Sequence, residues 1–310
     1  MRNRIAYIVG MSTLIVVALH AQQQPAAPAQ GQAAPTAPAQ GRGGGGRGGG
    51  GGVPAVANPN GVRIFIRAGL KSHAEGQHDY PQFLADWSKV LTDRGARVDG
   101  GLHFPTAKQL EATDVMVMYK GDAGYMTDEE KADMDAFVKR GGGLVSFHDT
   151  LCGPDPVYYS TLVGGAKKHG EQNFSAGVMR YTIVDKAEPI MKGMSDFTLN
   201  DEAFMQMTWA PTGLHVLASV PMPGGARAGE VVPQIWTYEH TVPGGQPSRA
   251  FVWMQGHLYA NFVDPQVQPM ILRGIAWAAK KPIDSLMRVG PRTGGRGIGG
   301  SDIVVPPAGN

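Results

Sequence analysis

The chain has 310 residues, including 44 glycines and 23 prolines, and its formal net charge is only +2. This near-neutral balance gives no reason to expect DNA, RNA or an anionic membrane as a partner. Cys152 is the only cysteine, so an internal disulfide is excluded.

Residues 1–21 have the layout of a secretory signal peptide. Arg2 and Arg4 precede an almost wholly apolar run over 5–19, and Ala21 offers a small residue for cleavage. The run is short for a bilayer span, which needs about 20 residues. We therefore predict a periplasmic or secreted protein with no integral membrane span after cleavage. An uncleaved N-terminal anchor is the alternative.

Two low-complexity segments flank the rest of the chain. Residues 22–60 consist mostly of Gln, Ala, Pro and Gly, and residues 287–310 are also rich in glycine and proline. Neither segment has enough apolar side chains to build a core, so both are predicted to be disordered. The remaining residues, 61–286, are predicted to form one α/β domain with a substantial core.

The first half of this domain alternates strand-like and helix-like segments. Three apolar runs predict buried strands, at 62–68, 114–119 and 144–148. One helix is predicted over 81–95, and a second begins at a capping box formed by Thr127 and Glu130. Parallel strands need crossover connections of this kind, so the order predicts a largely parallel sheet with helices on both faces.

The second half of the domain is less regular. Four more strands are predicted between loops rich in proline and glycine, at 178–184, 214–220, 233–239 and 249–255. An amphipathic helix over 265–279 closes the domain. We expect these strands to extend the same sheet and not to form a second domain.

Four histidines follow apolar segments of the domain, namely His78, His148, His169 and His257. The carboxyl ends of the strands form the ligand crevice of an open α/β sheet, so these imidazoles are predicted to share one site. Two or three histidines with a carboxylate make a common open site for a divalent ion. We therefore predict that all four bind a metal, Zn²⁺ or Mn²⁺. The alternative of a solvated histidine is strongest for His73, in a polar loop.

Several stretches of the domain together resemble the ThuA-like family, named for trehalose utilisation. They are KSHAEGQHDYP, GGGLVSFHDT, LVGGAKKHG, NDEAF, and QGHLYANF followed by ILRGIAWAAKKP. The resemblance implies a three-layer, flavodoxin-like fold related to class I glutamine amidotransferases. It also implies a sugar-processing protein that acts on 3-keto sugars or 3-keto glycosides by hydrolysis, elimination or isomerisation.

Roles for individual residues follow from the resemblance and from the implied chemistry. His148, Glu202 and His257 are predicted to be catalytic, and Glu202 matches the acidic position of the family as ligand or base. Abstraction of the C2 proton of a 3-keto sugar needs a base near pKa 7, and a Lewis acid on the carbonyl would help. The residues predicted to contact the sugar are His73, Asp149 and Tyr259. A solvated turn is the alternative for Glu202 and its neighbour Asp201.

Cysteine and nucleotide chemistry are not expected. The amidotransferase relatives use a cysteine on a sharp strand-to-helix turn, whereas His148 occupies that strand end here and Cys152 comes four residues later. The GGG before this strand lacks the Lys and Ser/Thr of a phosphate-binding loop, so no nucleotide is predicted. Two function classes are open: an exported enzyme of oxidised sugars, and a noncatalytic carbohydrate-binding or scaffolding protein. The oligomeric state is also open.

Overall fold

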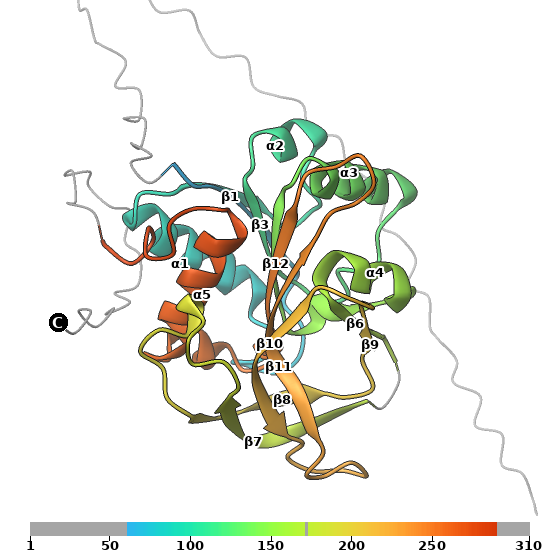
Figure 1. The fold of residues 1–310 in the computed structure, drawn as a ribbon, viewed down its shortest axis with the longest axis vertical. Coiled ribbons are helices and arrows are strands. Elements are labelled where there is room, and N and C mark those ends of the chain that lie inside the picture. Colours follow the sequence, from blue (N-terminus) through green and yellow to red (C-terminus); the bar gives the residue numbers. More distant parts are fainter. Residues whose placement is uncertain (1–60, 171–172, 290–310) are drawn as a thin grey trace, which may run out of the picture. The chain divides into compact units, whose positions relative to one another are not determined.

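The computed structural model describes residues 61–170 and 173–289, which contain a nine-stranded mixed sheet (Figure 1). The predicted signal peptide, the predicted linker and nearly all of the predicted C-terminal tail lie outside these residues. Five adjacent strands form a parallel half, in the order β2 (Arg97–Gly101), β1 (Arg63–Ala68), β3 (Val115–Tyr119), β4 (Gly143–Phe147) and β12 (Ser248–Trp253).

The antiparallel half of the sheet continues from β12. Its strands follow in the order β11 (Val231–His240), β10 (Leu214–Pro221), β7 (Phe174–Ile183) and β8 (Phe197–Phe204). A small second sheet contains β5 (Cys152–Gly153), β6 (Gly165–Lys168) and β9 (Thr208–Trp209). The predicted strands of the second half therefore do extend the main sheet. The sequence analysis had not predicted β2 or β8.

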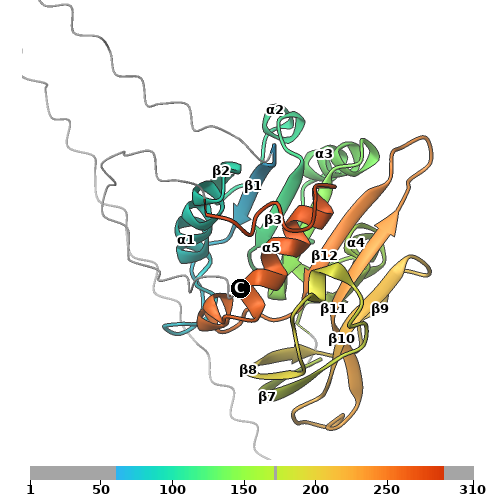
Figure 2. The same cartoon turned by 60° about the vertical axis from the view of Figure 1, so that its left-hand side comes forward.

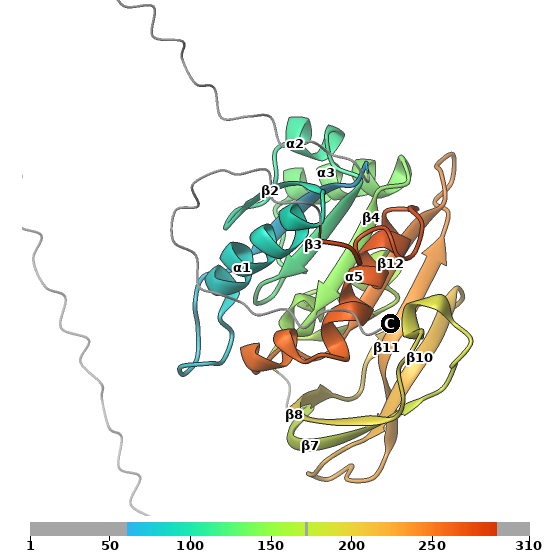
Figure 3. The same ribbon diagram turned by 90° about the vertical axis from the view of Figure 1, so that its left-hand side faces the viewer.

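Helices cover both faces of the parallel half, which makes three layers. α1 (Tyr80–Asp93) and α5 (Val267–Ala278) lie on one face, as Figures 2 and 3 show. The opposite side carries the short α2 (Ala107–Glu111), α3 (Asp128–Lys139) and α4 (Pro156–Val163). None of the helices in the described ranges has the length and apolar character of a membrane span.

The alternation of side chains along β1 shows how the sheet separates two cores. Ile64 and Ile66 pack into the hydrophobic cluster that contains the buried residues of α1 and α5. Phe65, between them, packs into the other cluster, which contains Met134 and Phe137 of α3. Successive side chains of a strand point to opposite faces, so a continuous apolar run is the pattern that a sheet covered on both sides requires. The flavodoxin-like α/β fold predicted from the sequence is confirmed.

The close packing of α5 on β12 depends on Gly274. A Cβ atom at this position would lie 2.2 Å from Cδ1 of Phe251. We expect Gly274→Ala to lower the free energy of unfolding by up to about 2 kcal/mol, because overpacking costs about 1–3 kcal/mol and helix propensity returns about 1 kcal/mol. Urea unfolding measures the change. The double variant Gly274→Ala/Phe251→Leu should recover part of this loss, because the leucine leaves room for the added methyl group. If the two substitutions changed the free energy of unfolding additively, that result would contradict this contact.

The parallel strands bring three separate segments to one edge of the sheet. Because β1, β4 and β12 run in the same direction, the segments that follow them all emerge at their carboxyl ends. The short 3-10 helix η1 (His148–Leu151) begins directly after β4. The loop after β1 meets the segment after β12 through a bridge between Gln77 and Leu258. This edge is where the candidate site lies.

Candidate functional site

Three of the predicted histidines converge at this edge. His78 Nε2 lies 3.0 Å from His148 Nε2 and 2.9 Å from His257 Nδ1. The three nitrogens are all within 4.8 Å of one another, and the three side chains come from three separate segments of the chain. Burial and then the neighbouring histidines lower the pKa of each imidazole, that of His78 to about 2. The rings are therefore neutral at pH 7 and present lone pairs.

His148 is fixed by the end of β4. It is completely buried, its ring stacks on Phe204, and Nδ1 is 3.4 Å from the carbonyl oxygen of Met254. A carbonyl can only accept a hydrogen bond, so this contact assigns the ring proton to Nδ1 and leaves the lone pair on Nε2 facing His78. The backbone of His148 has φ +51°, a left-handed conformation that non-glycine residues adopt rarely and often at functional sites.

The loop after β1 carries His73 and His78, and Lys71 organises it. Lys71 Nζ donates to four carbonyl oxygens of this loop, those of Ser72, His73, Ala74 and Gln77. His78 donates its backbone N–H to the carbonyl oxygen of His257 at 3.0 Å, which ties the loop to the segment after β12. His73 and His78 both have positive φ, and their rings are 3.9 Å apart. His73 is exposed and lies against the buried His78.

The segment that carries His257 is held by Asp201 of β8. The Asp201 carboxylate accepts hydrogen bonds from the backbone N–H groups of Gly256 and His257, at 3.2 and 3.0 Å, and from the Asn261 side chain. It also accepts the N–H of Glu202 at 2.7 Å. Burial raises the pKa of Asp201 to about 6, although these donors oppose the shift. Asp201 is therefore a positioning residue for His257.

Removing this carboxylate should weaken the fold. Asp201→Ala leaves several buried donors without an acceptor, and each costs roughly 1–3 kcal/mol. We expect the free energy of unfolding to fall by about 3 kcal/mol or more, as measured by urea denaturation. Asn200→Ala, which changes the adjacent exposed side chain, should unfold like the unaltered protein. An equal midpoint for Asp201→Ala and the unaltered protein would contradict this role.

Two carboxylates border the three histidines. Glu202, on β8, lies 4.0 Å from His148 Nε2 and 3.8 Å from His257 Nδ1. Asp149 lies 3.8 Å from His78 Nε2 and 3.9 Å from His148 Nε2. Burial, and then the charge of Asp149, raise the pKa of Glu202 to about 7. The sequence left a solvated turn as the alternative for Glu202, but the structure places it on a strand beside the imidazoles.

The three imidazoles fit a divalent metal ion. Tetrahedral zinc, with bonds of about 2.0–2.1 Å to nitrogen, places its ligand nitrogens about 3.3 Å apart. The observed separations of 3.0 and 2.9 Å are a few tenths of an ångström shorter, so small side-chain shifts would suffice. Each neutral imidazole has one ring nitrogen without a proton, so each of the three rings can turn a lone pair to a cation at this point. Glu202 and Asp149 supply the charge that neutral imidazoles lack.

His169 does not join these three histidines, which corrects the predicted set of four. Its Nδ1 lies 2.6 Å from Asp122 Oδ1, and it forms a second group with Asp122 and Cys152. His169 comes from the end of β6, in the small second sheet, and not from a strand of the parallel half. A different sheet carries it, so the shared edge of the parallel strands does not bring it to His148.

Tyr259, predicted to bind substrate, and Cys152, for which no role was expected, lie near the site but have other partners. Tyr259, predicted to contact a sugar, donates its hydroxyl to Asp86 of α1 at 2.6 Å. Cys152 is buried, which raises the pKa of its thiol, and its Sγ lies 3.5 Å from Asp149 Oδ1. A buried, protonated thiol is a poor nucleophile.

Three residues that shape the site were not predicted from the sequence, namely Lys71, Lys167 and Asp122. Lys167 is buried on β6, where its ammonium lies 4.1 Å from the Phe204 ring and 3.0 Å from Asn173 Oδ1. Its charge lowers the pKa of Glu202 and so opposes the effect of burial. The available signal was the KK pair directly before His169, because a lysine in a short apolar strand needs a partner.

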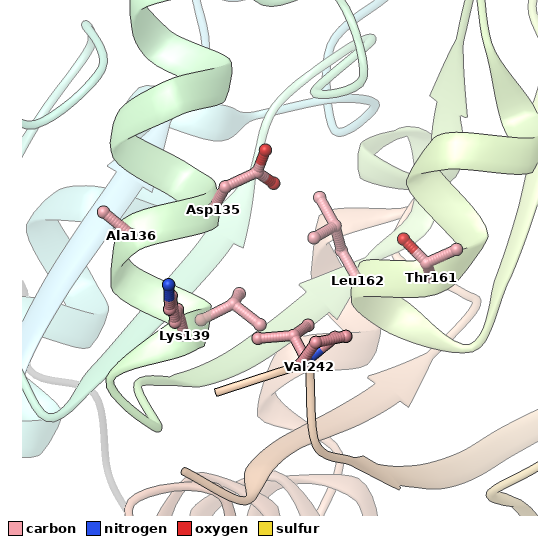
Figure 4. Close-up of a pocket in the computed structure, with 8 residues that line it drawn as sticks. Asp135, Ala136, Lys139, Thr161, Leu162 and Val242 are labelled. Atoms are coloured by element: carbon pink, nitrogen blue, oxygen red, sulfur yellow. The ribbon is translucent and has the colours of Figure 1, made fainter. Parts of the chain in front are cut away.

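A hollow lies away from the histidines. It has a volume of about 480 Å³ and is lined mainly by residues of α3, α4 and the loop after β11 (Figure 4). Its lining contains Val138, Leu162 and Val242, with Asp135 and Lys139 as the charged groups. These residues form no cluster of potential metal ligands or paired acids. The candidate site therefore remains the edge of the sheet where His78, His148 and His257 converge.

Comparison with known proteins identifies the family. The family model for ThuA, described as trehalose utilisation, matches residues 71–278. A ThuA-like protein of Bacteroides uniformis has a similar structure, with a TM-score of 0.56 and 19% identity over 73% of this chain and 95% of that one. A glutamine amidotransferase of Thermotoga maritima gives a TM-score of 0.37 and 13% identity over 73% and 96%. No curated protein matches the sequence. The chain therefore belongs to the ThuA family.

Proposed function

We propose that this protein is an enzyme of 3-keto sugars or 3-keto glycosides whose site holds a divalent metal ion on His78, His148 and His257. The observation that carries the proposal is the convergence of these three neutral imidazoles, with the Glu202 carboxylate within 4.0 Å. Membership of a family described as trehalose utilisation supports a carbohydrate substrate.

The site residues suit proton transfer next to a carbonyl. A bound Zn²⁺ or Mn²⁺ would act as a Lewis acid on the keto oxygen of the sugar. The ketone at C3 acidifies the proton at C2, and Glu202 is placed beside the imidazoles to accept that proton. His73 and Asp149 border the same space and are our candidates for binding the sugar hydroxyls.

The same proton transfer serves more than one reaction. In elimination, Glu202 takes the C2 proton, the C2–H electron pair forms a C1–C2 double bond, and the C1–O bond breaks. The electron pair of the C1–O bond leaves with the aglycone oxygen, and this oxygen can receive the proton that Glu202 holds. In isomerisation, the proton returns to carbon instead. Both need a ketone next to the C–H bond that breaks, so an unoxidised glycoside should not react.

Export is part of the proposal and rests on the sequence of residues 1–21 alone. Cell fractionation of an expressing bacterium, with the mass of the recovered protein, would test it. A periplasmic or extracellular product shortened by about the predicted signal agrees with export, and a full-length cytoplasmic product contradicts it.

Metal content and turnover together test the enzymatic function. The purified protein is analysed for metals and then assayed, after loading with zinc or manganese, on a series of 3-keto glycosides and their unoxidised parents. We expect one metal ion on the three histidines and turnover of the keto compounds only. A protein that binds sugars but turns over none of the keto compounds when loaded would instead be a noncatalytic carbohydrate-binding protein.

A further inference from the structure

A second group of potential metal ligands lies beside the three histidines. It comprises Asp122, Cys152 and His169, whose ligand atoms are all within 4.8 Å of one another. The three residues come from the loop after β3, from β5 and from the end of β6. The backbone of Asp122 donates to the carbonyl oxygen of Asp149 at 3.0 Å, and Gly124 donates to that of Cys152 at 2.9 Å. The fold thus fixes this group against the segment that follows His148.

Asp149 lies between the two groups. Its Oδ1 is 3.5 Å from the sulfur of Cys152 and 3.9 Å from His148 Nε2, and its Oδ2 is 3.8 Å from His78 Nε2. A carboxylate in this position can coordinate a cation in either of the two groups. Burial raises the pKa of Cys152 and of Asp122, and the nearby charge of Asp149 acts in the same direction.

Each buried polar atom of this group has a single partner. Asp122 Oδ1 is buried and lies 2.6 Å from His169 Nδ1. The thiol of Cys152 is completely buried and donates to the Asp149 carboxylate. Carboxylate oxygens, a sulfur and an imidazole nitrogen that converge in this way have the chemistry of a cation site, because all of them can bind the same ion.

We propose that Asp122, Cys152 and His169 bind a second divalent cation, with Asp149 shared between the two metal sites. One sulfur, one imidazole nitrogen and carboxylate oxygens make a ligand set that suits zinc. On binding, the Cys152 thiol gives up its proton to solvent and the thiolate forms the bond to the metal. His169 is about half exposed, with 51% of its side chain accessible, so it can swing from its 2.6 Å contact with Asp122 to the wider spacing of metal ligands.

Binding of a cation by Asp122, Cys152 and His169 goes beyond the proposed function, while the sharing of Asp149 and the count of two equivalents rest on the metal site proposed there. The competing explanation is a metal-free ion pair, in which Asp122 only orients His169. The two explanations differ in the role of sulfur: a second metal requires a bond to Cys152, and the ion pair does not.

Cobalt titration of the purified protein separates them, because Co²⁺ bound by a thiolate has a near-ultraviolet charge-transfer band. After removal of bound metal with a chelator, we expect two equivalents of Co²⁺ to bind and this band to appear. Cys152→Ser should bind one equivalent and show no band. His169→Ala, at a half-exposed position that should tolerate the change, should weaken the second site by about 10-fold or more.

Matched variants show which site is affected. His148→Ala should lose the other equivalent and keep the thiolate band, which distinguishes failure of the first site from failure of the second. His103→Ala, an exposed histidine outside both groups, should retain both equivalents. The proposal is overturned if the unaltered protein shows no thiolate band, or if Cys152→Ser and His169→Ala both bind two equivalents with unchanged affinity.

Discussion

His148→Ala is expected to abolish stoichiometric metal binding at the three histidines and to lower turnover of a 3-keto glycoside by orders of magnitude. His148 contributes one of three converging nitrogens, and its ring is held by Phe204 and by the carbonyl of Met254. Two remaining imidazoles leave a cation without a third fixed ligand. Metal analysis after dialysis and steady-state kinetics with added zinc or manganese measure the two effects.

His148 is completely buried, so a second variant is needed to distinguish loss of the site from unfolding of the protein. His257→Ala removes a ring of the same group that is 14% exposed and should give the same two losses with an unchanged circular dichroism spectrum. His215→Ala provides the control, because His215 is an exposed histidine that pairs with Asp185 at 3.1 Å outside this group. Full turnover in His148→Ala, together with its loss in Cys152→Ser, would reverse the assignment in favour of cysteine chemistry.

Glu202→Gln should lower kcat by about 100-fold or more while the bound metal is retained. The amide keeps the shape of the side chain, so the pocket should stay packed, but it cannot accept the C2 proton. The three imidazoles remain in place, which is why metal content and turnover should separate in this variant. Single-turnover kinetics on a glycoside carrying deuterium at C2 would show directly whether breaking of this C–H bond has become slow.

Glu188→Gln is the matched control for that substitution. Glu188 lies near His215 and outside the three-histidine group, so the same change of chemistry there should leave kcat unaltered. If Glu202→Gln lost the metal and turnover together, Glu202 would be a ligand and not the base. Unchanged kcat with unchanged metal would remove Glu202 from the reaction altogether.

The chain's own pattern determined the half of the fold that is covered by helices on both faces, and it determined three of the central residues. Apolar runs that fit a sheet covered on both faces predicted β1, β3 and β4, and the capping box of Thr127 and Glu130 is present at the start of α3. His148 directly follows a buried strand, and His78 and His257 come after two others. Parallel strands end at one edge, so these local signals were enough to place the three histidines together.

The family resemblance predicted Glu202 as a site residue, but only the tertiary structure decided how the acidic side chains reach the histidines. Glu202 and Asp201 lie on β8, which pairs with β7 at the far end of the sheet, and Asp201 reaches His257 across more than fifty residues of sequence. His169 also follows an apolar segment, but that segment belongs to the second sheet, where His169 meets Asp122. Periodicity reports which face of an element is buried, because burial follows local geometry. It carries no information about which distant element supplies the partner, since that choice depends on the packing of the whole sheet.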